Sequence, residues 1–223
     1  MNEIGKFYKP ENVEQFYSEV VPVYQTAFAG EPWFEVSKCA DRERVQRCVG
    51  GLSSLPLGQL CELCGNYPIR TAYEKDELIN RFEAFAQTRP TAWYLEKAEV
   101  GITLAAIVWS ATPETIADEK YSDVPDIKPW LIRNLRTQPI AWLDEVFADR
   151  IKKPRGNLKN FRAMCVGLAE QLQVDTIAFR TINESMIAAA KRDFGDNVLV
   201  FARNIDVPDR RDFVIIKLGG DKI

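Results

Sequence analysis

The stretch from Trp142 to Leu158, WLDEVFADRIKKPRGNL, decides the interpretation of this chain. Its beginning belongs to an apolar segment, Ile140–Ala148, that predicts a strand. A short basic loop follows and opens into Asn157–Leu172, where apolar residues recur at the spacing of one helix face. Because free N–H groups and the helix dipole attract anions at a helix start, the three parts together predict a phosphate site. A solvated basic turn between two ordinary elements gives the same pattern.

The positive charge of this loop is a local feature. Lys152, Lys153 and Arg155 lie in it, whereas the whole chain of 223 residues carries a formal net charge of −3. Such a balance gives no general attraction to nucleic acid or to an anionic membrane. Hydrophobic residues make up 46% of the chain and charged residues 27%, as in an ordinary globular protein. The length suits a single domain, which we assign to residues 1–223.

Apolar periodicity places further strands and helices on both sides of this stretch. We predict strands over Ala92–Lys97, Gly101–Ser110, Thr176–Ile182, Asn197–Ala202 and Asp212–Leu218. We predict helices over Val13–Phe28 with a bend or break at Pro22, over Leu78–Phe85, from Thr112 onward, over Lys128–Leu135 and over Glu184–Arg192. The order of these elements predicts an α/β (α+β) fold with a mixed, mostly antiparallel central sheet flanked by helices.

The central stretch resembles the cofactor motif of the GNAT superfamily of N-acetyltransferases, Arg/Gln-x-x-Gly-x-Gly/Ala. Counted from the strand Leu143–Asp149, Lys153 falls at the Arg/Gln position, Gly156 at the first glycine and Leu158 at the Gly/Ala position. Downstream, the predicted strand that runs into Asn183 resembles the second cofactor motif of the family. The resemblance implies a GNAT-like sheet whose central strand splays away from its neighbour to admit acetyl-CoA.

The resemblance further implies an acetyl-CoA-dependent N-acetyltransferase that acts on an amine of a small molecule or a protein. Backbone groups of the central strand are implied to line the pantetheine arm, and a main-chain N–H there is a candidate to polarise the thioester carbonyl. Amides at the start of the next helix are implied to hold the pyrophosphate. The implied cofactor-binding residues are Val146, Phe147, Ala148, Lys153, Arg155, Gly156, Asn157, Leu158, Lys159, Asn160 and Asn183.

Two positions depart from the family pattern. Leu158 is bulky where the family prefers glycine or alanine, which let phosphate oxygens approach the backbone. Ala190 stands where the family often has a tyrosine that protonates the leaving thiolate. The alternative is therefore a GNAT-like binding or regulatory protein that binds acyl-CoA or a partner without turnover.

The chain contains no histidine, which excludes Ser-His-Asp and Cys-His nucleophilic systems. A proton acceptor for amine acetylation must then be a carboxylate, and Asp144 and Glu145 lie on the motif strand. Since strand side chains alternate, the two carboxylates are expected on opposite faces. Glu145 is the candidate base, although the sequence somewhat favours a surface carboxylate or a partner of Arg150. Tyr94 and Tyr121 are candidate acids by residue type alone.

Four of the five cysteines fall within residues 37–68, which we interpret as a small Cys-rich insert. Cys39, Cys48, Cys61 and Cys64 have the spacing C-x8-C-x12-C-x2-C, and the last pair is followed by a glycine. Without histidine, an all-thiolate structural zinc site is the prediction, and free cytosolic thiols are the alternative. Cys165 falls on the apolar stripe of its predicted helix, so we expect a buried and inert thiol.

The sequence also bounds the surroundings of the protein. An odd number of cysteines is typical of a reducing cytoplasm, and no apolar run reaches the ~18 residues of a membrane-spanning helix. We therefore expect a cytoplasmic monomer or homodimer. Arg42, Arg44 and Arg47 could serve a zinc-ribbon adaptor for nucleic acid, but the acidic balance disfavours nucleic acid as a partner, and we interpret the arginines as a solvated helix face.

Overall fold

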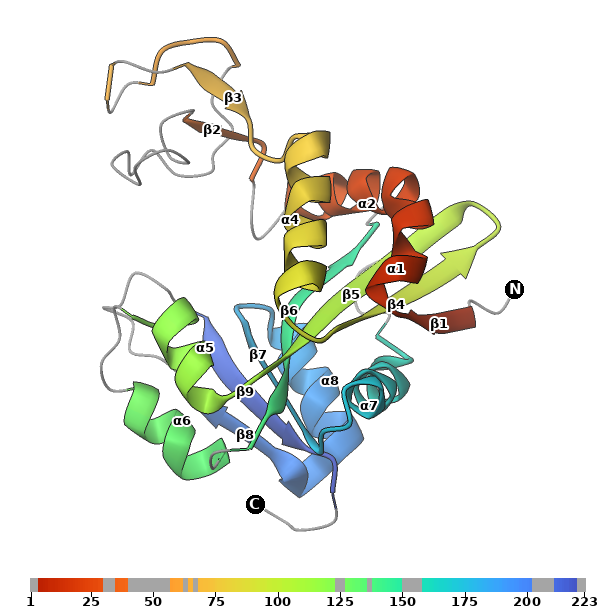
Figure 1. Cartoon of the computed structure of the whole chain (residues 1–223), viewed down its shortest axis with the longest axis vertical. Coiled ribbons are helices and arrows are strands. Elements are labelled where there is room, and N and C mark those ends of the chain that lie inside the picture. Colours follow the sequence, from red (N-terminus) through yellow and green to blue (C-terminus); the bar gives the residue numbers. More distant parts are fainter. Residues whose placement is uncertain are drawn as a thin grey trace.

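The computed structural model describes residues 4–29, 35–39, 57–61, 64–65, 68–122, 127–135, 138–149, 158–201 and 211–219 (Figure 1). Its strands are β1 (Ile4–Tyr8), β2 (Ser37–Cys39), β3 (Ile69–Thr71), β4 (Thr91–Ala98), β5 (Gly101–Ala111), β6 (Ile140–Ala148), β7 (Thr176–Thr181), β8 (Val198–Phe201) and β9 (Asp212–Lys217). Its helices are α1 (Pro10–Val13), α2 (Tyr17–Ala29), α4 (Lys75–Thr88), α5 (Pro113–Lys120), α6 (Ile127–Leu135), α7 (Phe161–Gln171) and α8 (Glu184–Phe194). None of these helices combines the length and the apolar character needed to cross a membrane.

In the described part of the chain, seven strands form one sheet in the order β1-β4-β5-β6-β7-β9-β8, and β2 pairs with β3 separately. Neighbouring strands of the large sheet run antiparallel, except that β6 and β7 run parallel. The predicted mixed, mostly antiparallel sheet is thereby confirmed. Because parallel strands need a crossover, the chain passes through α7 between β6 and β7.

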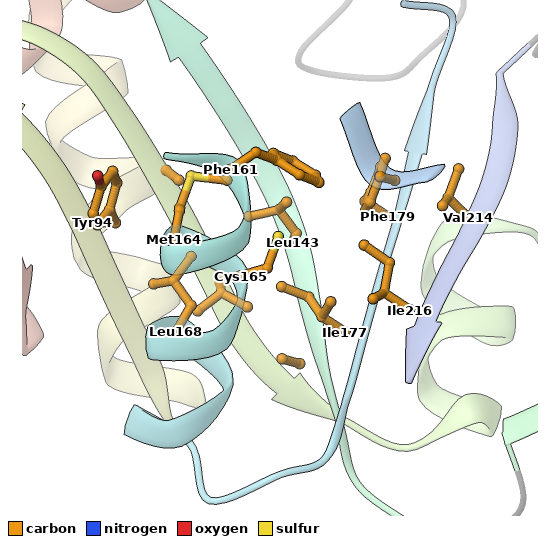
Figure 2. Packing of buried hydrophobic residues seen from close by; sticks show 14 of the residues in the cluster. Tyr94, Leu143, Phe161, Met164, Cys165, Leu168, Ile177, Phe179, Val214 and Ile216 are labelled. Atoms are coloured by element: carbon orange, nitrogen blue, oxygen red, sulfur yellow. The ribbon is translucent and has the colours of Figure 1, made fainter. Parts of the chain in front are cut away.

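Helices cover both faces of the sheet, and the alternation along β5 separates the two layers (Figure 1). Ala105 and Ile107 pack with α2 and α4, and Trp109, two residues on, packs on the same face with α5 and α6. Ala106 faces the other way and packs with α7 and α8. Figure 2 shows this second layer, in which Cys165 of α7 lies over β6 and β7. The segment of β6 that carries Asp144 and Glu145 therefore lies between two layers of helices.

The N-terminal helix breaks earlier than predicted. A 3₁₀ turn at Glu14–Phe16 separates α1 from α2, whereas Pro22 lies inside α2, so the helix does not break at Pro22 and the predicted bend there stays a prediction. Pro22 is exposed, while Val21 and Val23 beside it are buried. Burial of the flanking side chains on the sheet offsets the missing N–H of the proline.

Gly167 of α7 leaves room for Phe7 of β1, a strand that the sequence did not indicate. A Cβ atom at Gly167 would lie 2.1 Å from the Phe7 ring. We expect Gly167→Ala to lower the free energy of unfolding by up to about 2 kcal/mol, because an overpacking cost of about 1–3 kcal/mol exceeds the ~1 kcal/mol gained in helix propensity. Urea denaturation measures this difference. Gly219→Ala is the control, since its Cβ would meet only ordinary contacts at 3.8 Å, and equal stability of both variants would contradict the prediction.

Candidate active site

A β-bulge at Asp144 shapes the middle of β6. Glu145 lies opposite Ile107 of β5 and Leu143 lies opposite Val108, so Asp144 is an extra residue with no partner across the strand pair. The extra residue shifts the alternation and turns both carboxylates toward the face that α2, α4 and α5 cover, as their contacts show. The expectation that Asp144 and Glu145 face opposite sides is therefore wrong, because it assumed an unbroken alternation.

Glu145 is held by side chains from α2 and α4. Its Oε1 accepts hydrogen bonds from Arg81 Nη2 at 2.5 Å and from Tyr24 Oη at 3.2 Å, and Arg81 Nη1 also donates to Tyr24 Oη at 3.0 Å. Burial raises the pKa of Glu145, and the nearby Arg81 lowers it by less, so the pKa stays above its usual value. With its side chain only 15% exposed, Glu145 is no surface carboxylate. Arg150, its predicted partner, lies outside the described residues.

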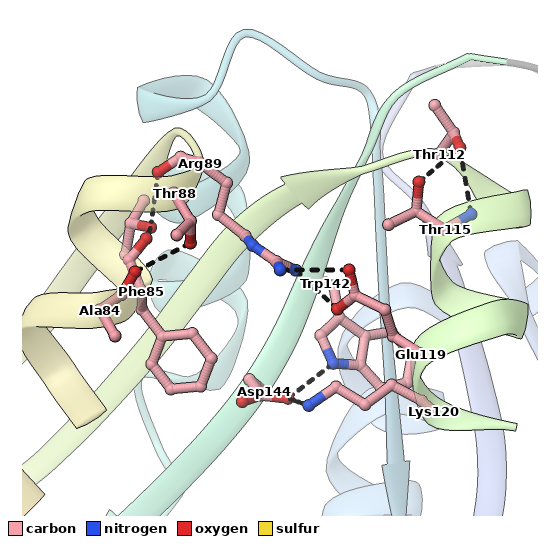
Figure 3. Close-up of polar contacts among 11 residues, drawn as sticks. Ala84, Phe85, Thr88, Arg89, Thr112, Thr115, Glu119, Lys120, Trp142 and Asp144 are labelled. Carbon is pink, nitrogen blue, oxygen red and sulfur yellow. Dashed lines mark hydrogen bonds and ion pairs between the residues drawn. The ribbon is translucent and has the colours of Figure 1, made fainter.

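Asp144 forms a second charged pair, with Lys120 (Figure 3). Its Oδ1 lies 2.6 Å from Lys120 Nζ of α5 and accepts a hydrogen bond from Trp142 Nε1 at 2.9 Å. Burial works to raise the pKa of Asp144, but the Lys120 ammonium and the hydrogen bonds lower it, and the net shift is downward. Among the described residues, the buried Asp144 Oδ2 has no hydrogen-bond partner. The two neighbouring carboxyl groups thus have pKa values shifted in opposite directions.

The strand that carries these carboxylates separates from β7. The parallel pairing covers only Ala141 with Ile177 and Trp142 with Ala178, although β6 continues to Ala148 (Figure 1). Beyond Trp142, the backbone of β6 on that side has no strand partner within the described residues. The implied splay of the central strand is present in this geometry.

The residues predicted to line a pantetheine arm lie on this unpaired part of β6. Val146 and Ala148 are half-buried and pack against the α7 layer. Phe147 points to the opposite face, where its ring lies 4.8 Å from the Tyr24 ring. Their side chains thus anchor the strand on both faces, and only its backbone is left toward β7.

The predicted pyrophosphate loop is described only at its end, because Lys153, Arg155, Gly156 and Asn157 lie outside the described residues. Leu158 is half-buried and packs against the α7 layer, and its carbonyl accepts a hydrogen bond from Arg192 at 3.1 Å. Lys159 is exposed. The side chain of Asn160, at the N-cap of α7, donates to Glu96 instead of capping the helix. The first turn of α7 therefore receives no side-chain cap from its N-cap residue.

Asn183 links the end of β7 to α8. Its Oδ1 accepts a hydrogen bond from the Ser185 N–H at 3.0 Å, which is an N-cap of α8. Its own N–H donates to Thr181 Oγ1 at 2.9 Å. Local capping accounts for an asparagine here, so its predicted contact with the cofactor stays a prediction.

The candidate acids are both enclosed. Tyr94 is buried on the α7 face and donates to Glu96 at 2.9 Å, whereas Tyr121 is buried against Trp142 and Phe213. Ala190 is fully buried in the core beside α7, so the family's tyrosine position holds a packing residue here. Within the described residues, no hydrogen bond joins Tyr94 or Tyr121 to Glu145 and the side chains that hold it.

Three of the four predicted zinc ligands come together. The Sγ atoms of Cys39, Cys61 and Cys64 all lie within 4.8 Å of one another. Cys48 lies outside the described residues. Cys165 is buried in the core as predicted, and burial raises the pKa of its thiol well above the usual value.

Sequence reasoning missed the residues that hold the two carboxylates. Tyr24, Arg81 and Lys120 come from three helices, and Tyr24 lies 121 positions before Glu145. Only the place of Arg81 beside the apolar stripe of its helix could have hinted at an inward-facing cation. No local pattern pairs it with a strand 64 positions away.

No protein-family model matches the sequence, and no curated protein matches it. Solved structures do share its fold. The structure of histone acetyltransferase HPA2 and related acetyltransferase from Corynebacterium glutamicum ATCC 13032 is 11% identical, with a TM-score of 0.55 and 100% of both chains covered. A mosquito arylalkylamine N-acetyltransferase like 5b is 9% identical, with a TM-score of 0.55, and covers 97% of this chain and 100% of its own. At this identity the likeness is one of fold.

Proposed function

We propose that this chain, which has the fold of GNAT N-acetyltransferases, transfers an acetyl group from acetyl-CoA to an amine of a small molecule or a protein. The observation that carries the proposal is the position of Glu145. A carboxylate with a raised pKa lies on β6 just beyond the point where β6 and β7 stop pairing. A general base and an unpaired backbone edge, the two elements that amine acylation requires, therefore adjoin each other.

The residues present fit acetyl-CoA in two respects. The backbone of Val146, Phe147 and Ala148 beyond the last β6–β7 pair offers hydrogen-bonding groups to a pantetheine arm. The N-terminus of α7, whose N-cap side chain is engaged elsewhere, suits a pyrophosphate. Lys153, Arg155, Gly156 and Asn157 are proposed to complete this cradle with Leu158, Lys159, Asn160 and Asn183.

Acetyl-CoA supplies an activated thioester. Glu145 takes a proton from the acceptor ammonium, directly or through one water, so that the amine nitrogen regains its lone pair. A main-chain N–H of Val146 or Phe147 polarises the thioester carbonyl. The second proton of the attacking nitrogen passes to the departing sulfur, which yields the amide and free CoA. These proton transfers need no tyrosine. This agrees with the alanine at position 190 and with the burial of Tyr94 and Tyr121.

The alternative is a binding or regulatory protein that holds acyl-CoA or a partner without turnover. The observation that favours it is the packing of the two departures from the family pattern. Leu158 packs against the core and Ala190 lies fully within it, so both serve stability in this chain. Arg81, which holds Glu145 at 2.5 Å, also opposes protonation of that carboxylate.

Two measurements test the proposal in sequence. Calorimetric titration with acetyl-CoA is expected to show one site per chain with a Kd of roughly 1 μM to 1 mM, the usual substrate range. A panel of small amines and lysine peptides is then screened for release of the free CoA thiol. Binding without thiol release by any acceptor favours the regulatory alternative, and absence of binding contradicts acetyl transfer as well as acyl-CoA binding.

A further inference from the structure

The thiols of the β2–β3 pair and of the tight turn next to it form a cluster. Cys39 ends β2, whereas Cys61 and Cys64 lie on the segment that leads into β3. The Gly65 N–H donates to the Cys61 carbonyl at 2.7 Å, and Gly65 has a positive φ of 65°. Such a turn needs glycine, and it directs two thiols separated by two residues toward the same point.

The separation of the sulfurs fits a shared metal ion. Cys39 Sγ and Cys64 Sγ lie 3.6 Å apart, and all three sulfurs lie within 4.8 Å of one another. Zinc–sulfur bonds of about 2.3 Å in a tetrahedron place sulfurs ~3.8 Å apart. The sulfurs of a disulfide lie at only about 2.05 Å. The cluster therefore has the dimensions of a thiolate metal site.

Within the part of the chain that the structure describes, the β2–β3 pair has only a small apolar core. Its apolar cluster consists of Cys39, Cys61 and Ile69, with Cys64 packed against them, so three of its four members are cysteines. The strands are three residues long each, and they lie apart from the large sheet (Figure 1). Two short strands with so little buried surface are not stable without a crosslink or a metal.

We propose that Cys39, Cys61 and Cys64 bind one Zn²⁺ in a structural site. Each thiol gives up its proton on binding, and the resulting thiolates neutralise the ion. The sequence names Cys48 as the fourth ligand, which lies outside the described residues. Cys39 and Cys61 are buried, so an ion bound between these thiols would be shielded from substrates, and its role would be structural.

The bound metal would fix the β2–β3 pair against the helix that carries Arg81. Lys38 of β2 and Arg70 of β3 lie opposite each other and both bind Glu77 of α4, at 2.9 Å and 2.5 Å. Arg81 follows Glu77 by four residues, one helical turn, and binds Glu145. Zinc would thus stabilise the first turn of α4, one helical turn before Arg81.

Metal analysis of the purified full chain tests the proposal. We expect about one zinc per chain in the wild type, and at least a tenfold loss in Cys39→Ser, Cys61→Ser and Cys64→Ser after mild chelator treatment. Cys165→Ala is the matched control, because its buried thiol lies in α7 and should leave the zinc content unchanged. A wild type without zinc after expression in zinc-supplemented medium, or an equal loss in Cys165→Ala, would overturn the site.

Cobalt substitution of the wild type covers the case in which the serine variants fail to fold. Co²⁺ bound by thiolates is expected to give intense sulfur-to-metal charge-transfer absorption and the strong visible bands of tetrahedral coordination. Absence of these bands, or a mass showing a Cys39–Cys64 disulfide, contradicts the proposal. Zinc content is independent of acetyl-CoA binding, so this test can fail while the proposed function stands.

Discussion

Replacing Glu145 by glutamine is expected to lower the rate of acetyl transfer by about 10²–10⁴-fold, the usual contribution of a general base. Glutamine has the same shape and can still accept the hydrogen bonds from Arg81 and Tyr24, so the cluster should stay assembled. Because the change removes the proton acceptor alone, the Kd of acetyl-CoA should remain within about twofold of the wild type. Steady-state kinetics and calorimetry measure the two quantities on the same preparations.

Glu19→Gln is the matched control for this variant. Glu19 has a cationic partner too, Lys97 at 2.9 Å, but both side chains are solvent-exposed and far from β6 in sequence. Its turnover should be unchanged. In the wild type, kcat/KM should fall as the pH drops through the raised pKa of Glu145, because only the deprotonated carboxylate accepts a proton. Equal turnover of Glu145→Gln and the wild type would remove Glu145 from the mechanism.

Replacing Lys120 by methionine is expected to lower the free energy of unfolding by about 3–5 kcal/mol at neutral pH. The substitution leaves Asp144 ionised with its side chain only 5% exposed and without its counter-ion at 2.6 Å. Urea denaturation at several pH values measures the effect. In the wild type, the pKa of Asp144 is lower in the folded protein than in the unfolded chain. The Asp144–Lys120 pair therefore stabilises the fold at pH values above the pKa of the unfolded chain, and this stability is lost as the pH falls. The difference between variant and wild type should therefore shrink in acid.

Lys128→Met provides a control with the same chemistry and distance. Lys128 and Asp118 also lie 2.6 Å apart, but their side chains are 44% and 64% exposed. Exposed pairs contribute only ~0–1 kcal/mol, so this variant should unfold almost like the wild type. A comparable loss in both variants would mean that burial of Asp144 does not govern the effect. Restoration of stability in Lys120→Met with Asp144→Leu would identify the unpaired carboxylate as its cause.

The strong apolar segments were predictable from sequence. Ile140–Ala148 is a strand with the predicted bounds, and Thr112 caps a helix through its hydroxyl as the Thr-Pro-Glu pattern indicates. The short strand β1, Ile4–Tyr8, was not predictable, since Gly5 and Lys6 interrupt any apolar pattern. It forms because β4 offers it an edge and because Gly5 leaves space for the Tyr94 hydroxyl. Strand formation of this kind depends on a neighbour that is distant in sequence.

The candidate site, too, was predictable from the sequence only in part. The sequence by itself determined the strand–loop–helix order, because periodicity is a property of neighbouring residues, and the absence of histidine, from which a carboxylate base is predicted. Only the tertiary structure decided that a bulge turns Asp144 and Glu145 to one face and that Arg81 and Lys120 neutralise them. The pKa of a buried carboxylate depends on which charges packing brings within a few ångströms, and residues far apart in the chain supply those charges.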